Sequence, residues 1–242
     1  MGETSLHADL VNYLLDVLKW LLHGRLYAIY DNLNFYQTAD PYEYPIAPDI
    51  AIIKGIAHRP TRSWRVGKSG PAPQVVFEIA SQETWQKDLA EKPAKYARMG
   101  VQEYFAYDPN EPPLSHSANR RLFGWRLDQG RQVMKEILPG SNGSLWSASL
   151  ESWLVPDGTM LRLYDHSGQM RLTGMEAEAR QRQAADQRAD MAVQQAEAEA
   201  RRAQAETQRA DAAIQQAEIE ARRARILAEK MRSLGIDPDQ LL

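Results

Sequence analysis

Hydrophobic and polar positions follow two different periods along the first two thirds of the chain. In "TSLHADLVNYLLDVLKWLL" (residues 4–22), apolar residues recur every three or four positions, which predicts an amphipathic helix. Short runs rich in branched and aromatic residues follow, and such runs are typical of β-strands. These runs cover residues 25–36, 48–53, 74–80, 103–109, 121–128, 132–138 and 160–165, and a hairpin joins the fifth to the sixth. A helix, several strands and a helical segment between two of them predict a core of the α/β or α+β class.

The composition of the chain changes near residue 174. All six Trp and all ten Tyr lie before this point, whereas Ala, Glu, Gln and Arg dominate after it. The first part is long enough for one domain with its own core. We therefore expect a single domain over residues 1–173, a long helix over 174–234 and a short tail over 235–242.

The expected C-terminal helix contains an internal repeat. "ADMAVQQAEAEARRA" (189–203) returns 21 residues later as "ADAAIQQAEIEARRA" (210–224). Since 21 residues are three heptads, the repeat keeps the phase of a left-handed coiled coil. The seam with this phase consists of Val193, Ala196, Ala200, Ala203, Thr207, Ala210, Ile214, Ala217, Ala221, Ala224, Ala228 and Met231. A second stripe competes with it and consists of Met191, Ala198, Ala205, Ala212, Ile219 and Ile226.

Two interpretations of this helix remain open. Pairs such as Glu197–Arg201 and Glu218–Arg222 have the favourable i,i+4 order and would stabilise a single solvated helix. A coiled coil would instead use the seam from Val193 to Met231 to join two copies of the chain. Because a solvated helix has no need to keep phase, we expect a homodimer formed at least partly through this seam.

Composition excludes several classes of protein. Of the 242 residues, 43% are hydrophobic and 25% are charged, which is ordinary for a globular protein with a core. The absence of cysteine excludes disulfides and thiolate metal sites. Residues 1–10 do not resemble a signal peptide, and the most apolar segment carries Asn12, Asp16 and Lys19, so we expect neither secretion nor a membrane span. A cytoplasmic protein is the expectation.

Two acidic residues interrupt apolar strands. Glu78 lies within "VVFEIA", and Asp49 lies at the start of the strand in "APDIAII". A buried carboxylate is costly unless a positive charge meets it, and two converging carboxylates become tolerable when they share a divalent cation. Mg²⁺ suits such a pair because it binds oxygen and usually has one or two carboxylate ligands. The alternative is that Asp49 caps a turn and Glu78 pairs with an Arg or Lys.

Basic residues lie near both acids in the sequence. "SQETWQKDLAEK" brings Lys87, Asp88 and Lys92 shortly after the strand of Glu78, and a cation beside a metal site stabilises the charge that develops in phosphodiester cleavage. Between the two acidic strands, the segment 54–68 has no acid and could contact a phosphate backbone. Its basic residues are Lys54, Arg59, Arg62, Arg65 and Lys68. A solvated loop is the alternative for this segment.

These blocks resemble the Uma-two family of restriction endonucleases within the PD-(D/E)xK nuclease superfamily. The resemblance covers residues 1 to about 170 and rests on "PDIAII", "VVFEIAS", "KDLAEKPAKYARMGVQEYFAYDP" and "GTMLRLYD", in this order. It implies a mixed sheet flanked by helices and cleavage of DNA with Mg²⁺, or with Mn²⁺ in its place. The matching residues are Asp49 and Glu78 as the acids, followed by Asp88 and Lys92. The resemblance also implies that the Ile79 carbonyl completes the metal shell.

The sequence departs from the superfamily pattern at one position. The lysine should follow the second acid by two residues, but Ala80 stands there. The expected catalytic lysine is therefore Lys92, with Lys87 and Lys95 as alternatives, and the small side chain at 80 leaves room for it. His7, on the first helix, matches a histidine that the family often has, with a packing role as the alternative. The rival to an endonuclease is a catalytically silent module that binds nucleic acid or protein and is assembled by its coiled coil.

Overall fold

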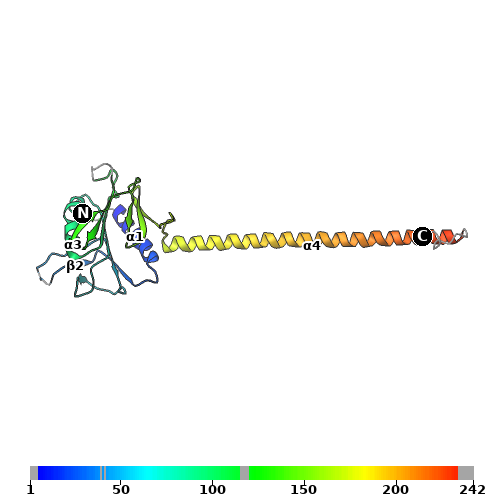
Figure 1. Cartoon of the computed structure of the whole chain (residues 1–242), viewed down its shortest axis with the longest axis horizontal. Coiled ribbons are helices and arrows are strands. Elements are labelled where there is room, and N and C mark those ends of the chain that lie inside the picture. The colour runs from blue at the N-terminus through cyan, green and yellow to red at the C-terminus, as the bar shows by residue number, and fades with distance from the viewer. Residues whose placement is uncertain (1–4, 39, 41, 115–119, 234–242) are drawn as a thin grey trace. The chain divides into compact units, whose positions relative to one another are not determined.

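The computed structural model describes residues 5–38, 40, 42–114 and 120–233, and it consists of two compact units. The first unit spans Met1–Glu178 and contains all the strands, and the second spans Ala179–Leu242 (Figure 1). No helix among the described residues combines the length and apolar character needed to cross a membrane.

A six-stranded mixed sheet forms the centre of the first unit. Its strands are β1 (Tyr27–Asp31), β3 (Ile50–Lys54), β5 (Val75–Ile79), β6 (Glu103–Tyr107), β7 (Leu122–Asp128) and β8 (Val133–Glu136), in this spatial order. The pairs are antiparallel except β5 with β6, which is parallel. A parallel pair needs a crossover connection, and the segment between residues 79 and 103 provides it with two helices. The mixed α/β class predicted from the sequence is therefore confirmed.

One face of this sheet packs against a long helix and a smaller sheet. The helix is α1 (Ser5–Leu21), and the smaller sheet contains β9 (Leu145–Ser147), β10 (Ser152–Asp157) and β11 (Met160–Tyr164) in the order β11-β10-β9. The core on this side combines leucines of α1 and β11 with alternate residues of the central strands. Its central-strand members include Ile50, Ile52, Val75, Phe77, Ile79 and Phe105. The predicted leucine-lined helix is confirmed.

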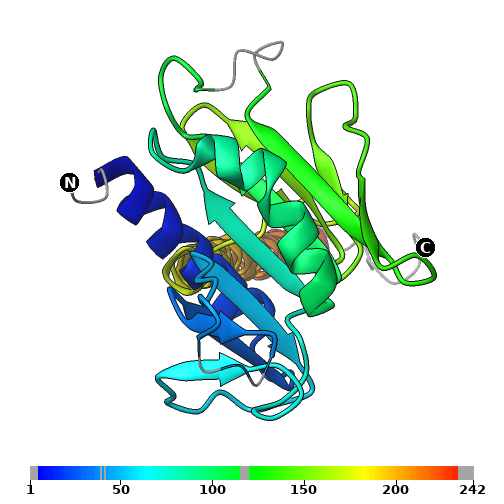
Figure 2. The same ribbon diagram turned by 90° about the vertical axis from the view of Figure 1, so that its left-hand side faces the viewer.

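The opposite face packs against α2 (Trp85–Ala90) and α3 (Lys92–Met99), which lie in front of the sheet in Figure 2. A two-stranded parallel ribbon of β2 (Asn34–Tyr36) and β4 (Ser63–Arg65) contributes to the same core. Pro93 lies in the first turn of α3, and Gly100 ends the helix with φ of +85°, a left-handed conformation that glycine adopts without strain.

The strand predictions were incomplete. All seven predicted runs contain strands, and β7 and β8 form the predicted hairpin. Three strands were missed, namely β4, β9 and β10. The segment 54–68 is therefore not simply a solvated loop, because β4 pairs with β2 and its Trp64 is fully buried.

The C-terminal part is one continuous helix, α4 (Gly174–Ser233), of 60 residues. At 1.5 Å per residue it is about 90 Å long, and the long C-terminal helix predicted from the composition is confirmed. Beyond its first turn almost every side chain is exposed. Pairing through a coiled coil stays a prediction, and the predicted tail 235–242 lies outside the described residues.

Candidate active site

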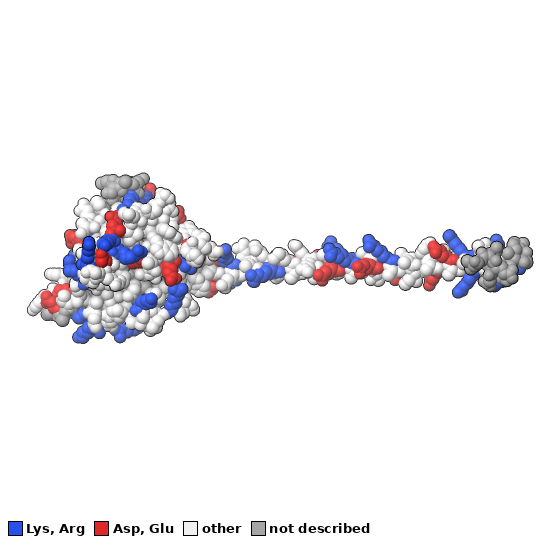
Figure 3. Space-filling view, in the orientation of Figure 1, with Lys and Arg blue, Asp and Glu red and all other residues white. Residues whose placement is uncertain are grey.

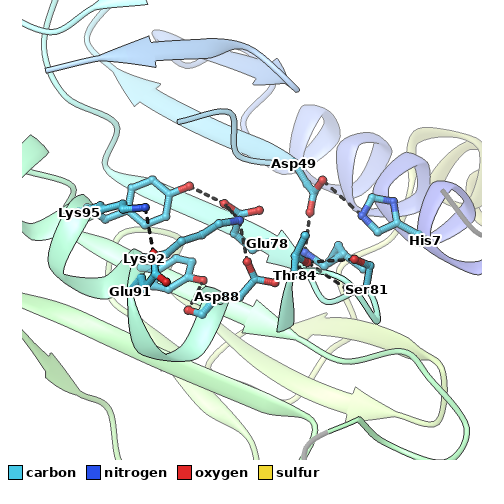
Figure 4. Close-up of polar contacts among 12 residues, drawn as sticks. His7, Asp49, Glu78, Ser81, Thr84, Asp88, Glu91, Lys92 and Lys95 are labelled. Atoms are coloured by element: carbon cyan, nitrogen blue, oxygen red, sulfur yellow. Dashed lines mark hydrogen bonds and ion pairs between the residues drawn. The ribbon is translucent and has the colours of Figure 1, made fainter. Parts of the chain in front are cut away.

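Asp49, directly before β3, and Glu78, within β5, lie at opposite positions of these neighbouring strands. The antiparallel register pairs Ile50 with Phe77, so Asp49, one residue earlier, lies opposite Glu78. Residues opposite each other in such a pair point to the same face. The backbone N–H of Ile79 donates to Asp49 Oδ2 at 2.6 Å and fixes this carboxylate against β5. Figure 4 shows the two acids on neighbouring strand ends.

Glu78 is a buried carboxylate, with only 4% of its surface exposed. Two donors reach the same oxygen: Lys92 Nζ lies 2.8 Å from Oε1, and the Tyr96 hydroxyl donates to it at 2.5 Å. Burial raises the pKa of Glu78, Lys92 and Tyr96 lower it, and the nearby Asp49 raises it, and together these effects bring the pKa to about 7. Glu78 is therefore poised to exchange a proton near neutral pH.

Lys92 links Glu78 to a second buried carboxylate. Its Nζ lies 2.7 Å from Oδ1 of Asp88, which is 1% exposed and accepts a hydrogen bond from Thr84 Oγ1 at Oδ2. Burial lowers the pKa of Lys92, but the charges of Glu78 and Asp88 outweigh burial and raise it overall. Lys92 is thus a fixed cation between two acids (Figure 4).

α2 and α3 deliver this cation to the strand ends. Asp88 lies on α2, and Lys92 is the first residue of α3. The Tyr104 hydroxyl of β6 donates to the backbone carbonyl of Asp88 at 2.8 Å and ties α2 to the sheet. Asp88, Lys92 and Tyr96 are four residues apart, the spacing that places side chains on one helical face. Tyr96 was missed in the sequence, although this spacing from Lys92 could have identified it.

The other lysines considered for this site do not reach the acids in the described contacts. Lys87 is exposed on α2, and Lys95 pairs with Glu91 at 3.3 Å. Ala80 is buried directly after β5, where a longer side chain would need additional space. Lys92 is therefore the lysine that contacts Glu78, which is the kind of pairing given as the alternative to a metal, and its catalytic role stays a prediction.

His7 of α1 contacts the other acid. Its Nε2 lies 3.3 Å from Asp49 Oδ1, and the imidazole is mostly buried. Asp49 thus has the Ile79 amide on one oxygen and His7 beside the other. The geometry assigns His7 a position next to the candidate site rather than a role in core packing alone.

The donor set fits a divalent cation held by two carboxylates. Lys92 and Tyr96 both contact Oε1 of Glu78, which leaves Oε2 as the oxygen that could bind a metal. Within residues 5–38, 40, 42–114 and 120–233, no three His, Cys, Asp or Glu side chains gather around one metal position. Mg²⁺ accepts such a sparse site because it keeps several water ligands. Asp49 and Glu78 are the residues that could hold it, and a role for the Ile79 carbonyl stays a prediction.

The basic segment 54–68 is partly built into the fold. Four of its five basic residues are exposed, namely Lys54, Arg59, Arg62 and Lys68. Arg65 is half-buried, stacks 4.7 Å over Tyr36 and lies 3.9 Å from Glu43. Trp64 anchors the segment by donating from Nε1 to the carbonyl of Pro71 at 3.0 Å. The segment is thus anchored to the fold, and one of its exposed cations, Arg59, donates to the carbonyl of Ser69 and lies 5.3 Å over the Trp64 ring.

Comparisons with known proteins agree with the resemblance seen in the sequence. Residues 1–156 match the family model Uma2, which is described as "Putative restriction endonuclease". A solved structure from Anabaena variabilis ATCC 29413, described as "a putative nuclease belonging to DUF820", is similar with a TM-score of 0.43 and 15% sequence identity. The similarity covers 62% of this chain and 76% of that chain. No curated protein matches the sequence.

Proposed function

This chain belongs to the Uma2 family of restriction-endonuclease-like proteins, and from that premise we propose that it cleaves DNA with the help of Mg²⁺. The observation that carries the proposal is the charged cluster at the end of β5. There Glu78, Asp88 and Lys92 are held within 2.8 Å contacts, opposite Asp49. A buried acid with a raised pKa, as Glu78 is, beside a fixed cation is typical of a site that performs chemistry.

Asp49 and Glu78 are the proposed metal ligands. Glu78 would use Oε2, because Oε1 is already bound by Lys92 and Tyr96. Asp49 is held in place by the Ile79 amide and is flanked by His7. A bound Mg²⁺, or Mn²⁺ in its place, supplies a Lewis acid for the phosphate and lowers the pKa of a water ligand. Both ligands must be ionised to bind it, so binding favours the deprotonated form of Glu78.

Lys92 is the proposed cation for the transition state. Its ammonium group is held by two carboxylates and needs no rearrangement to face a phosphate beside Glu78. Such a preorganised charge stabilises negative charge that develops on the phosphate, or orients the attacking water. Asp88 acts through Lys92 and is a positioning residue rather than a metal ligand.

The DNA substrate needs contacts beyond the site itself. The exposed cations of the segment 54–68 lie in the connection between the strands that bear Asp49 and Glu78. We propose that Lys54, Arg59, Arg62 and Lys68 contact phosphates. The half-buried Arg65 would contribute less to phosphate binding. Cleavage of both strands of a duplex requires two sites, and a homodimer formed partly through α4 would supply them.

A substrate panel tests the proposed activity. The full chain is incubated with supercoiled plasmid, linear duplex and single-stranded DNA, each with Mg²⁺, Mn²⁺ or EDTA. We expect cleavage of at least one substrate with either metal and none with EDTA. Lys92→Met should abolish cleavage. Lys95→Met is the matched control and should retain full activity, because Lys95 lies on the same helix as Lys92 but pairs with Glu91.

One observation favours a second candidate function, a catalytically silent module that binds nucleic acid. Lys92 and Tyr96 both occupy Glu78 Oε1, and this arrangement would also serve a purely structural ion pair. A silent module would retain DNA on the basic segment without metal and would cleave none of the substrates. DNA retention that persists in EDTA and in Lys92→Met, with no product under any condition, would favour this alternative.

A further inference from the structure

The charges of α4 are segregated by heptad position. With Val193 at position a, the predicted seam occupies a and d, and the second stripe occupies f. Between residues 197 and 223, every acid lies at e or g, beside the seam: Glu197, Glu199, Glu206, Asp211, Glu218 and Glu220. Over the same residues every base lies at b or c, beside the second stripe: Arg201, Arg202, Arg209, Arg222 and Arg223.

The helix therefore has two different long faces. We call the seam with its e and g residues the acidic face, and the second stripe with its b and c residues the basic face. Position f lies opposite a and d on the helix, so the two faces point in nearly opposite directions. Figure 3 shows the basic and acidic side chains on opposite edges of the middle of α4.

Each face has exposed apolar side chains at its centre. On the acidic face Val193 is 58% and Ile214 is 59% exposed, and on the basic face Ile219 is 48% and Ile226 is 50% exposed. Intrahelical pairs such as Glu197–Arg201, at 3.7 Å, account for the charges of a solvated helix. They do not account for branched apolar residues on two faces, since such residues have lower helix propensity than Ala and gain nothing in water.

Two acidic faces are poor partners for each other. In a parallel pair, position g of one helix meets position e of the other, which sets Glu206 against Asp211 of the second copy. An antiparallel pair sets e against e and g against g, and every charged residue at these positions from 197 to 220 is acidic. Arg225 and Arg232 change this only at the C-terminal end. Two basic faces repel each other for the same reason.

We propose that the acidic face of one copy packs against the basic face of a second copy of this chain. The acids beside one seam then meet the arginines beside the other stripe, and Val193 and Ile214 pack against the apolar centre of the opposite face. The contact is heterologous, because it joins two different surfaces. A dimer of this kind leaves one acidic and one basic face uncovered, so further copies add as concentration rises. The proposal does not depend on nuclease activity.

Two matched double variants of the full chain separate the faces. Val193→Lys with Ile214→Lys places positive charge at the centre of the acidic face, where it would meet another chain's arginines. Ile219→Glu with Ile226→Glu places negative charge at the centre of the basic face, where it would meet another chain's acids. Lys and Glu both favour helix, so circular dichroism should show unchanged helix content. Each variant keeps the other face intact.

Sedimentation equilibrium of these proteins is the test. The wild type should exceed the dimer mass at high concentration and dissociate when salt rises from about 50 mM to about 500 mM, since exposed ion pairs are screened. Each variant alone should associate at least about tenfold more weakly. An equimolar mixture should form a heterodimer of twice the 27.4 kDa chain mass, because one good acidic face meets one good basic face.

Three outcomes would overturn the proposal. If Ile219→Glu with Ile226→Glu dimerises as the wild type does, the chains pair through identical seams. If the mixture stays monomeric while helix content is retained, the two faces do not recognise each other. If the wild type is monomeric and binds duplex DNA, and Ile219→Glu with Ile226→Glu loses this binding, the basic face binds nucleic acid rather than a second copy.

Discussion

Replacing Glu78 with glutamine should make the protein more stable and inactive at the same time. Glutamine resembles the protonated glutamate, so Glu78→Gln removes the cost of an ionised buried carboxylate. Burial raises the folded-state pKa of Glu78 to about 7 from an ordinary 4.5. The folded protein therefore binds more protons than the unfolded chain between these values, and stability falls as pH rises through this window.

The magnitude follows from the two pKa values. The difference between 4.5 and about 7 corresponds to roughly 3 kcal/mol once Glu78 is ionised in both states. We expect Glu78→Gln to raise the free energy of unfolding by about 3 kcal/mol at pH 8 and by less than about 1 kcal/mol at pH 5. Urea unfolding followed by Trp fluorescence measures this quantity, and all six Trp lie before residue 174.

Glu103→Gln is the matched control, because Glu103 is also a buried carboxylate on a neighbouring strand. Arg126 binds Glu103 through two nitrogens at 2.9 and 2.8 Å, and Ser147 donates to it at 2.6 Å. Glu103→Gln should lower the free energy of unfolding by about 3 kcal/mol at both pH values. Two results would refute this reasoning: Glu78→Gln is also less stable than the wild type at pH 8, or its effect on the free energy of unfolding does not change with pH. Either result would show that burial of the ionised Glu78 carboxylate does not destabilise the folded protein.

Further variants test the neighbours of Glu78 and the basic segment. Lys92→Met should lower the free energy of unfolding by about 3 kcal/mol near pH 7, because two buried carboxylates lose their cation, and Lys95→Met should leave it within about 0.5 kcal/mol in the same urea titration. Tyr96→Phe should lower the free energy of unfolding by about 1–2 kcal/mol, because it removes one hydrogen bond to the buried Glu78. A decrease smaller than the error of the titration would show that this bond does not stabilise the fold. Arg62→Ser with Lys68→Ser should weaken binding to DNA of every sequence and reduce the slope of log affinity against log salt concentration by about 2. Fluorescence anisotropy measures this slope. An unchanged slope would exclude these residues as phosphate contacts.

Much of the central sheet could be predicted because its strands follow simple patterns. Buried runs such as "VVFEI" and "EYFAY" and the leucine spacing of α1 reflect their burial directly. Two of the strands that were missed, β4 and β9, have only three residues each, and the partner of β4, β2, lies 29 positions earlier in the chain. Such pairing depends on tertiary contacts that no local pattern records.

The site was partly visible in the sequence for a similar reason. An acid within an apolar strand indicates that something must compensate its charge. The sequence predicted a shared Mg²⁺, with an Arg or Lys as the alternative, and Lys92 was named as the catalytic lysine through the family resemblance. The second contact, Tyr96, was missed because a buried tyrosine in a helix is usually a core residue. The register that sets Asp49 opposite Glu78 also required the structure, since the strands are separated by a long connection whose length does not fix their pairing.

The rate of plasmid cleavage by the full chain, with Mg²⁺ present and with Asp49→Asn as the comparison, tests the central claim most directly. Asp49 is exposed enough for this change to leave the core intact, and asparagine keeps an oxygen that the Ile79 amide can reach. We expect cleavage by the wild type that EDTA stops, and a loss of at least about 100-fold in Asp49→Asn with an unchanged unfolding curve. Equal cleavage by both proteins, or cleavage that continues in EDTA, would contradict it.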